Sequence, residues 1–207
     1  MVNPKYEFSG SKVSYVSPNI SLEDPDYNNA IEYCKHEVMA YEVSDEDCEL
    51  IKVGDAKVLH FYPAILAEIE GSMYELFDTE QDTFDIYCAL ELNSQIKINA
   101  NETIKDAFNW YTTMIIDRLE IYPQYSGQQL ASKFVKNLVR NNYLKQNNLL
   151  VLINAQAYLI EDNNFDNETE YKKARLKEEK IFISLYKKLG FTRINDNSNV
   201  MYLTIGE

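Results

Sequence analysis

The chain has 207 residues, of which 45% are apolar and 26% charged, and its formal net charge at pH 7 is -13. This composition is that of an ordinary folded protein with one domain or two small ones. Glycine accounts for 6 residues, about 3% of the chain, which excludes collagen-like, Gly-rich linker and disordered low-complexity sequences.

The negative charge is concentrated in the first half of the chain. Residues 1–100 hold 20 Asp/Glu and 6 Lys/Arg, a charge of -14, whereas residues 101–207 hold 13 and 14, a charge of +1. Nucleic-acid binding depends on clustered Lys and Arg, so nucleic acid is not an expected partner. The acidic half is either a solubility coat or a surface that attracts cationic ligands, and the near-neutral half can receive an anionic one.

The cysteines and histidines indicate in which cellular compartment the protein works and whether it could hold a disulfide or a metal site. Cys34, Cys48 and Cys88 are odd in number and widely spaced, which fits neither a disulfide framework nor a zinc site. With only His36 and His60, no metal site is expected. The start of the chain lacks an apolar signal segment, and no run approaches the 18 or more apolar residues of a membrane span. We therefore expect a cytoplasmic protein that is not associated with a membrane.

The N-terminal part, residues 1–55, has the weakest pattern. Lys12–Val16 alternates like a short strand, and Asn29–Cys34 is typical of the start of a helix. Asp45–Asp47 is expected in a solvated loop.

The next segments are more strongly patterned. Residues 57–69 form a largely apolar stretch of strand type, in which Pro63 indicates a bulge or an edge. Ser72 and Glu75 have the spacing of a capping box and predict one helix that continues to Leu92. A short polar strand is predicted at Gln95–Ile98.

A strand–helix–strand unit is predicted from Thr112 onwards. Thr112–Ile121 has the pattern of a buried strand that Pro123 ends, and Gly127 is a flexible position before a helix. The apolar positions of that helix have a period of 3.6 residues: Leu130, Ala131, Phe134, Val135, Leu138 and Val139. The apolar run Leu149–Ile153 is typical of a strand covered on both faces. The two strands should be parallel.

The chain ends with a helix and a strand. After a polar insertion at Glu161–Glu170, a helix is predicted to bury Ile181, Phe182, Leu185, Tyr186 and Leu189. Gly190 should end it as a left-handed C-cap, and Val200–Ile205 follows as a strand. The expected fold class is α/β, or more narrowly α+β, with a mixed central sheet, a βαβ core and flanking helices. A single domain is expected over residues 1–207.

The usual catalytic signatures are absent from the sequence, including GxSxG, HExxH, GxxxxGK[ST] and GxGxxG. The distinctive feature is a strand that ends in a turn at a helix N-terminus. Free N–H groups and the helix dipole make such a terminus an anion site, so a diphosphate could bind there.

Two segments resemble the GNAT-type N-acetyltransferases. Leu119–Ala131, LEIYPQYSGQQLA, is similar to the family's L-x-V-x-P-x-Y-R-G-x-G-x-G/A segment, and Leu185–Phe191 to its Y-x-x-x-G-F segment. Bacterial GNAT-like proteins of unassigned substrate are similar in particular, through an I-x-D-R-L/I-E-I strand. The resemblance covers roughly residues 55–207 and implies a GNAT fold with its acetyl-CoA-binding core at 112–207.

The resemblance also implies a co-substrate, acetyl-CoA, and the residues that bind it. Ser126 stands where the family has Arg and Gln129 where it has Gly, whereas Gly127 and Ala131 match. No metal is implied. The implied cofactor-binding residues are Leu119, Ile121, Ser126, Gly127, Gln128, Gln129, Leu130, Ala131, Ser132 and Asn154.

In the implied mechanism a substrate amine attacks the acetyl thioester directly. The N–H of Ile121 would stabilise the oxyanion and Tyr186 would protonate the leaving thiolate, although Tyr186 also fits a purely packing role. The base is Glu120 or Asp117, which alternation along a strand places on opposite faces, or it acts through water.

Three functions remain open at this point. The first is acetyl transfer from acetyl-CoA to a primary amine of a small cationic molecule or peptide. The second is CoA binding in a regulatory role, by a GNAT-fold protein that is catalytically weak or inactive. The third is a protein-interaction module, since 16 Tyr and 9 Phe could furnish an interface. The oligomeric state stays open, with a homodimer as one option.

Overall fold

A computed structural model describes residues 5–16, 27–43, 48–78, 81–143, 148–155 and 167–206. The strands are β1 (Lys5–Val16), β2 (Ile31–Val43), β3 (Cys48–Phe61), β4 (Lys97–Asn99), β5 (Glu102–Thr103), β6 (Thr112–Ile121), β7 (Leu149–Asn154), β8 (Thr192–Arg193) and β9 (Val200–Ile205). The helices are α1 (Tyr27–Ala30), α2 (Pro63–Glu68), α3 (Met73–Phe77), α4 (Gln81–Leu92), α5 (Ile104–Trp110), the 3-10 helix η1 (Pro123–Tyr125), α6 (Leu130–Tyr143) and α7 (Glu168–Lys188).

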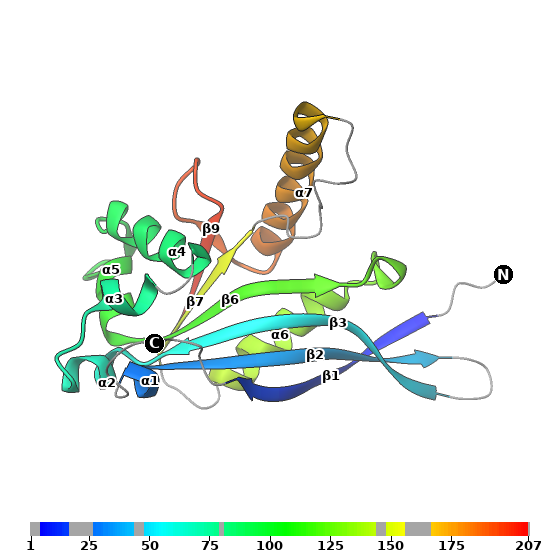
Figure 1. Cartoon of the computed structure of the whole chain (residues 1–207), viewed down its shortest axis with the longest axis horizontal. Coiled ribbons are helices and arrows are strands. Elements are labelled where there is room, and N and C mark those ends of the chain that lie inside the picture. Colours follow the sequence, from blue (N-terminus) through cyan, green and yellow to red (C-terminus); the bar gives the residue numbers. More distant parts are fainter. Residues whose placement is uncertain are drawn as a thin grey trace.

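A mixed sheet of seven strands runs through the molecule in the order β1-β2-β3-β6-β7-β9-β8. Figure 1 shows β1, β2, β3, β6 and β7 following one another in this order. Neighbouring strands are antiparallel except β6 and β7, which are parallel and joined through α6. β4 and β5 form a separate two-stranded ribbon. The fold is therefore α+β, with one parallel pair at the centre of an otherwise antiparallel sheet.

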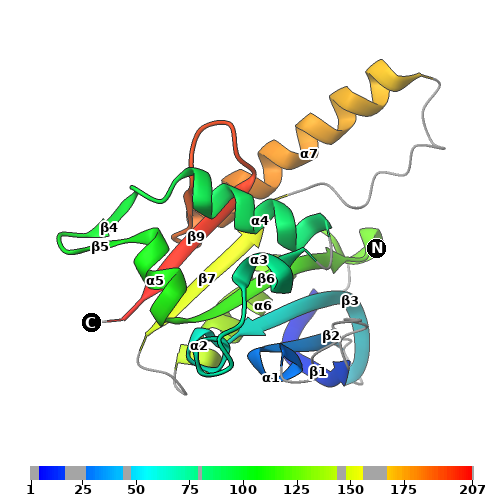
Figure 2. The ribbon, with the colours of Figure 1, turned by 60° about the vertical axis from the view of Figure 1, so that its left-hand side comes forward.

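Each face of the sheet carries its own hydrophobic core. On one face, Met114 and Ile116 pack with Phe134 of α6 and Tyr186 of α7. On the other, Ile115 packs with the aromatic residues of the helices that precede β6, among them Phe77 and Phe108. Figure 2 shows α3, α4 and α5 on this second face. Because both faces are covered here, Met114–Ile116 of β6 and Leu149–Ile153 of β7 are continuous apolar runs.

The predicted strand–helix–strand unit is confirmed. The structure has β6 over Thr112–Ile121, α6 from Leu130 and β7 from Leu149, all six residues of which are buried. β9 coincides with the predicted strand Val200–Ile205.

The predicted end of α7 is also confirmed. Gly190 has a φ of 97°, and its N–H donates to the carbonyl of Lys187 while that of Phe191 donates to Tyr186. These two bonds satisfy carbonyls of the last turn, which is the role of a left-handed C-cap. The predicted inward orientation of Ile181 is wrong, because its side chain is 57% exposed.

Two predictions for the first seventy residues are wrong. The helix expected at Asn29–Cys34 is a single turn that ends at Ala30, after which β2 begins, since Ile31 and Tyr33 are buried residues of strand type. The strand expected over 57–69 ends at Phe61, and Pro63 begins α2. Proline suits the first turn of a helix, where its missing N–H has no partner to lose. Residues 45–47, predicted as a solvated loop, and residues 161–166 of the predicted polar insertion lie outside the described residues. The end of that insertion is wrong, because α7 begins at Glu168 with Asn167 as its N-cap.

The helix predicted from Ser72 to Leu92 is two helices, α3 and α4. Ser72 is the N-cap of α3 as expected, but the carboxylate of Glu75 accepts from Tyr27 Oη at 2.7 Å. A complete capping box instead begins α5, where Thr103 and Asp106 exchange hydrogen bonds. The strand predicted at Gln95–Ile98 overlaps β4, which begins at Lys97. None of the helices in the described part of the chain is long and apolar enough to cross a bilayer.

One histidine in the core between the sheet and α6 predicts a pH-dependent stability. Burial lowers the pKa of His36 to about 4, and its ring lies 5.6 Å from that of Phe134. The unfolded chain, with an ordinary histidine pKa near 6.5, takes up the proton first as pH falls. This contribution to stability is therefore complete above about pH 6.5 and is lost as pH falls towards 4, on the order of 2 kcal/mol.

Urea unfolding of the wild type and of His36→Gln between pH 7 and pH 4 measures this effect. Carboxylates titrate in both proteins, so the difference between the two curves isolates the histidine. We expect the wild type to lose more stability than the variant over this interval. Parallel curves would contradict the assignment.

Candidate functional site

β6 and β7 diverge halfway along β6, as Figure 1 shows. Their parallel pairing runs from Thr112 and Leu149 to Ile116 and Ile153 and then stops. β6 continues along β3 as far as Ile121, whereas β7 ends at Asn154. Among the described residues, the last part of β6 therefore has a strand on one side and none on the other.

A β-bulge marks the point of divergence. In the β3–β6 register Lys57 lies opposite Arg118 and Val58 opposite Ile116, so Asp117 is an extra residue on β6. A bulge bends its strand and changes which residues share a face. The parallel pairing with β7 ends at the residue before this bulge.

The backbone groups beyond the bulge have defined directions. The N–H of Tyr122 donates to the carbonyl of Val53 at 2.9 Å, so it points towards β3. Because backbone groups alternate in direction along a strand, the N–H groups of Ile121 and Leu119 point away from β3, towards the open side. Their side chains pack against the α6 face of the sheet.

The prediction that Asp117 and Glu120 lie on opposite faces is wrong. The carboxylate of Asp117 forms an ion pair with Lys57 Nζ at 3.2 Å. Glu120 lies opposite Asp55, whose side chain is on the same face of β3 as that of Lys57. Simple alternation fails because the bulge inserts one residue between the two carboxylates. Both candidate bases thus lie on the face opposite α6. Asp117 is buried, whereas Glu120 is only partly buried and is paired with Arg118 at 3.0 Å.

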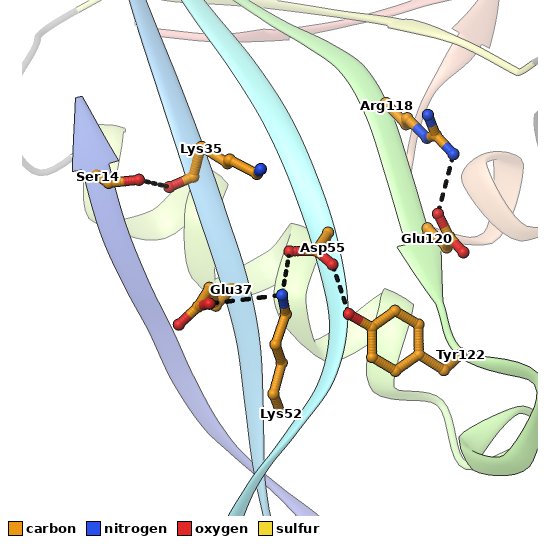
Figure 3. Close-up of polar contacts among 8 residues, drawn as sticks. All are labelled: Ser14, Lys35, Glu37, Lys52, Asp55, Arg118, Glu120 and Tyr122. Atoms are coloured by element: carbon orange, nitrogen blue, oxygen red, sulfur yellow. Dashed lines mark hydrogen bonds and ion pairs between the residues drawn. The ribbon is translucent and has the colours of Figure 1, made fainter. Parts of the chain in front are cut away.

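A polar network that the sequence analysis missed continues this face. Figure 3 shows Lys52 between Glu37, at 3.4 Å, and Asp55, at 2.8 Å, with Tyr122 donating to the second oxygen of Asp55 at 2.6 Å. Burial raises the pKa of Asp55, but the hydrogen bonds from Lys52 and Tyr122 outweigh it and leave that pKa lowered. The cross-strand register brings these residues together, and no local sequence motif indicates it.

The turn between β6 and α6 has two residues in the left-handed region. Gly127 has a φ of 78° and Gln129 a φ of 61°. Gln129 precedes the helix and its carbonyl accepts from the N–H of Lys133 at 3.0 Å. The first helical N–H groups belong to Leu130, Ala131 and Ser132, and N–H groups at a helix N-terminus favour a negative charge.

β1 fixes one side of this turn. The N–H of Tyr6 donates to Gln128 Oε1 at 3.0 Å, and the Tyr6 ring meets that of Tyr125 edge to face at 5.0 Å. The side chain of Ser126, in the same turn, is exposed. A strand from the start of the chain thus holds the predicted cofactor loop.

Gln129→Gly tests the backbone of this turn. Glycine adopts a positive φ without the penalty of about 1–2 kcal/mol that other residues incur, and the gain is partly offset by its greater freedom in the unfolded chain. We expect a stabilisation of up to about 1 kcal/mol in urea unfolding. The matched variant Gly127→Ala, whose Cβ would meet no atom within 4 Å, should lose about 1 kcal/mol through the backbone alone. A destabilised Gln129→Gly would contradict this account.

Tyr186 lies on the α6 face of the sheet. It is 4% exposed, and its ring contacts those of Phe182 and Phe191 at centroid distances of 6.4 and 5.9 Å. Burial raises the pKa of Tyr186, so the phenol keeps its proton at physiological pH. It belongs to the same core cluster as Ile153, at the end of the parallel pairing.

Asn154 is buried at the end of β7 with its amide unsatisfied. The residue is 4% exposed, and within the described part of the chain neither polar atom of its side chain has a hydrogen-bond partner. Its neighbour Ile153 pairs with Ile116, which places Asn154 next to Asp117 where the strands part. An unsatisfied buried amide is costly, so this group is suited to bind a ligand or water.

The structure brings the predicted residues to three adjacent places. The side chains of Leu119, Ile121 and Tyr186 lie on the face of the sheet that α6 covers. Those of Asp117, Glu120 and Asn154 lie on or beside the opposite face. The turn and the start of α6 follow the end of β6. No family model, no curated protein and no solved structure matches this chain.

Proposed function

We propose that the protein is an acetyl-CoA-dependent N-acetyltransferase of the GNAT fold, acting in the cytoplasm on a primary amine of a small cationic molecule or a peptide. The observation that carries the proposal is the divergence of β6 from β7 at the bulge of Asp117. It lies immediately before the turn and helix that resemble the family's acetyl-CoA segment. Cys34, Cys48 and Cys88 are not joined in disulfides, which is compatible with a reducing compartment.

The cofactor is proposed to lie along the open side of β6. The backbone groups of Leu119 and Ile121 point to that side and would bind the extended arm of acetyl-CoA as a neighbouring strand would. The diphosphate would bind the N–H groups of Leu130, Ala131 and Ser132, with Ser126, Gly127, Gln128 and Gln129 shaping the loop. The side-chain amide of Asn154 would supply a further polar contact to the cofactor.

The proposed reaction forms one bond and breaks one. The amine nitrogen attacks the thioester carbon, and the N–H of Ile121 donates to the oxyanion that forms. The C–S bond then breaks, the thiolate takes a proton from Tyr186, and the amine proton passes to a carboxylate, directly or through water. A phenol can take the acid role because its reference pKa of about 10 keeps it protonated at neutral pH.

Both carboxylates on the face opposite α6 remain candidates for the base. Asp117 lies at the bulge beside Asn154, and Glu120 lies nearer the end of β6 and the turn. Asp117→Asn and Glu120→Gln separate them. The variant that removes the base should raise the pH at which the amine becomes reactive, because the substrate must then lose its proton to solvent.

A second candidate is a CoA-binding protein without turnover. It is favoured by Ser126, which offers no positive charge to the diphosphate, and by Gln129, whose side chain stands where the family has none. Release of CoA thiol from acetyl-CoA, measured with a panel of polyamines, amino acids and short peptides, decides between the two. Amine-dependent release supports the enzyme. Binding of acetyl-CoA without release over the whole panel would leave the second candidate.

A further inference from the structure

A polar cavity lies away from the proposed acetyl-CoA site. Its volume is about 450 Å³, and it is enclosed by β1, β2, β3 and the second half of α6. In Figure 1 this half of α6 lies behind the sheet, away from the turn that precedes the helix. Asn141, in its wall, is eleven residues from Leu130, or roughly 16 Å along the helix axis.

Two buried imidazoles form the floor of the cavity. His36 is 5% exposed and His60 is 8% exposed, and both line it. Ser11 Oγ lies 3.0 Å from His36 Nδ1, which orients that ring. Burial lowers the pKa of His36 to about 4, so its imidazole is uncharged at neutral pH. A neutral imidazole has one donor and one acceptor nitrogen, and since Nδ1 of His36 is engaged with Ser11, Nε2 is the His36 atom that remains to bind a hydroxyl group.

One negative charge lies beside the imidazoles. Glu32 is directly opposite His60 in the β2–β3 register and accepts a hydrogen bond from Tyr62 Oη at 3.0 Å. Among the described residues that line the cavity, Glu32 is the sole carboxylate, and Lys and Arg do not occur. A cavity with this charge favours a singly positive ligand over a phosphate or carboxylate.

The wall contributed by α6 adds further donors and acceptors. Asn141 Nδ2 donates to Asn137 Oδ1 at 3.0 Å, which leaves polar atoms of both amides for other partners. At the mouth, the side chains of Val13 and Tyr15 are 47% and 74% exposed and offer apolar surface to the carbon chain of a ligand.

We propose that this cavity binds a small amino polyol, a chain of hydroxylated carbons with one ammonium group. The ammonium group pairs with Glu32, and the hydroxyls bond to the imidazoles of His36 and His60 and to the amides of Asn137 and Asn141. This site is separate from the proposed acetyl-CoA site, because it lies at the other end of α6. Binding here does not depend on whether the protein transfers acetyl groups.

Calorimetry with three ligands of one carbon skeleton tests the proposal: glucamine with a positive charge, sorbitol with none and gluconate with a negative charge. Glucamine is expected to bind with a Kd below about 1 mM, sorbitol about tenfold more weakly and gluconate more weakly still. Glu32→Gln, which can still accept from Tyr62, should weaken glucamine binding about tenfold and remove the difference from sorbitol. The control Glu49→Gln, an exposed carboxylate of β3 outside the cavity, should bind like the wild type.

Several results would overturn the proposal. Absence of glucamine binding at about 10 mM, gluconate binding as tight as that of glucamine, or an unchanged affinity in Glu32→Gln would each do so. A second variant, Asn141→Leu, keeps the test valid if Glu32→Gln misfolds. It changes an exposed residue of α6 rather than a residue of β2, and it removes an amide from the cavity wall. It should also weaken glucamine binding, and a wild-type affinity there would count against the site.

Discussion

Replacing Tyr186 with Phe is expected to lower kcat for acetyl transfer by at least about 100-fold, with the affinity for acetyl-CoA almost unchanged. The hydroxyl group is the sole difference between the two side chains. The ring remains packed between Phe182 and Phe191, so the core should keep its shape. Without the phenol, the thiolate leaves without a proton and the barrier to C–S cleavage rises.

The matched control is Tyr171→Phe, in the first turn of the same helix and far from the end of β7. It should retain wild-type kcat. Steady-state kinetics give kcat, and calorimetry gives the acetyl-CoA affinity. A Tyr186→Phe enzyme with wild-type kcat would remove Tyr186 from the mechanism, whereas parallel losses of kcat and affinity would indicate a packing role.

The largest stability effect is expected for Gly54→Ala, with a loss of about 3 kcal/mol. β3 and β6 approach so closely here that an added Cβ would clash with the backbone carbonyl of Glu120 and lie 3.0 Å from Ile121 Cδ1. A side chain can rotate away from such a clash, but a backbone carbonyl in a paired strand cannot. Separation of the two strands would also displace the proposed oxyanion donor.

Gly10→Ala serves as the comparison, because its Cβ would meet no atom within 4 Å and its cost comes from a φ of 149° alone. Urea unfolding at pH 7 should rank Gly54→Ala as the less stable variant by at least about 1 kcal/mol. Equal losses would show that close contact between β3 and β6 does not determine the effect at Gly54.

Periodicity was sufficient to predict the centre of the fold. β7 is a continuous apolar run covered on both faces, Met114–Ile116 is a shorter apolar run within β6, and α6 has an apolar stripe with a period of 3.6 residues. The turn before α6 was located for a similar reason, since Pro123 and Gly127 are local signals of the backbone itself.

The relative positions of the candidate bases could not be predicted, because a bulge is a property of two paired strands. Asp117 is an extra residue only with respect to Lys57 and Val58 on β3. The same limit applies to the network of Lys52, Asp55 and Tyr122, which depends on cross-strand register. Alternation along β6 alone therefore predicted opposite faces for Asp117 and Glu120, which lie on the same face.

Other predictions of secondary structure were wrong at residues whose type occurs both in strands and in helices. Pro63 was expected at a bulge or an edge within a strand but begins α2, and Ile31 was expected in a helix but begins β2. The capping box of Thr103 and Asp106, which begins the buried helix α5, has the same spacing as that of Ser72 and Glu75 and was a signal available in the sequence.

Calorimetric titration of the 207-residue chain with acetyl-CoA tests the central claim most directly. The backbone of β6 that faces the open side and the free N–H groups of α6 predict one site per chain with a Kd below about 100 μM. CoA should compete for that site, because both ligands carry the diphosphate. Absence of any binding heat with acetyl-CoA at about 1 mM would contradict both the enzyme and the CoA-binding alternative.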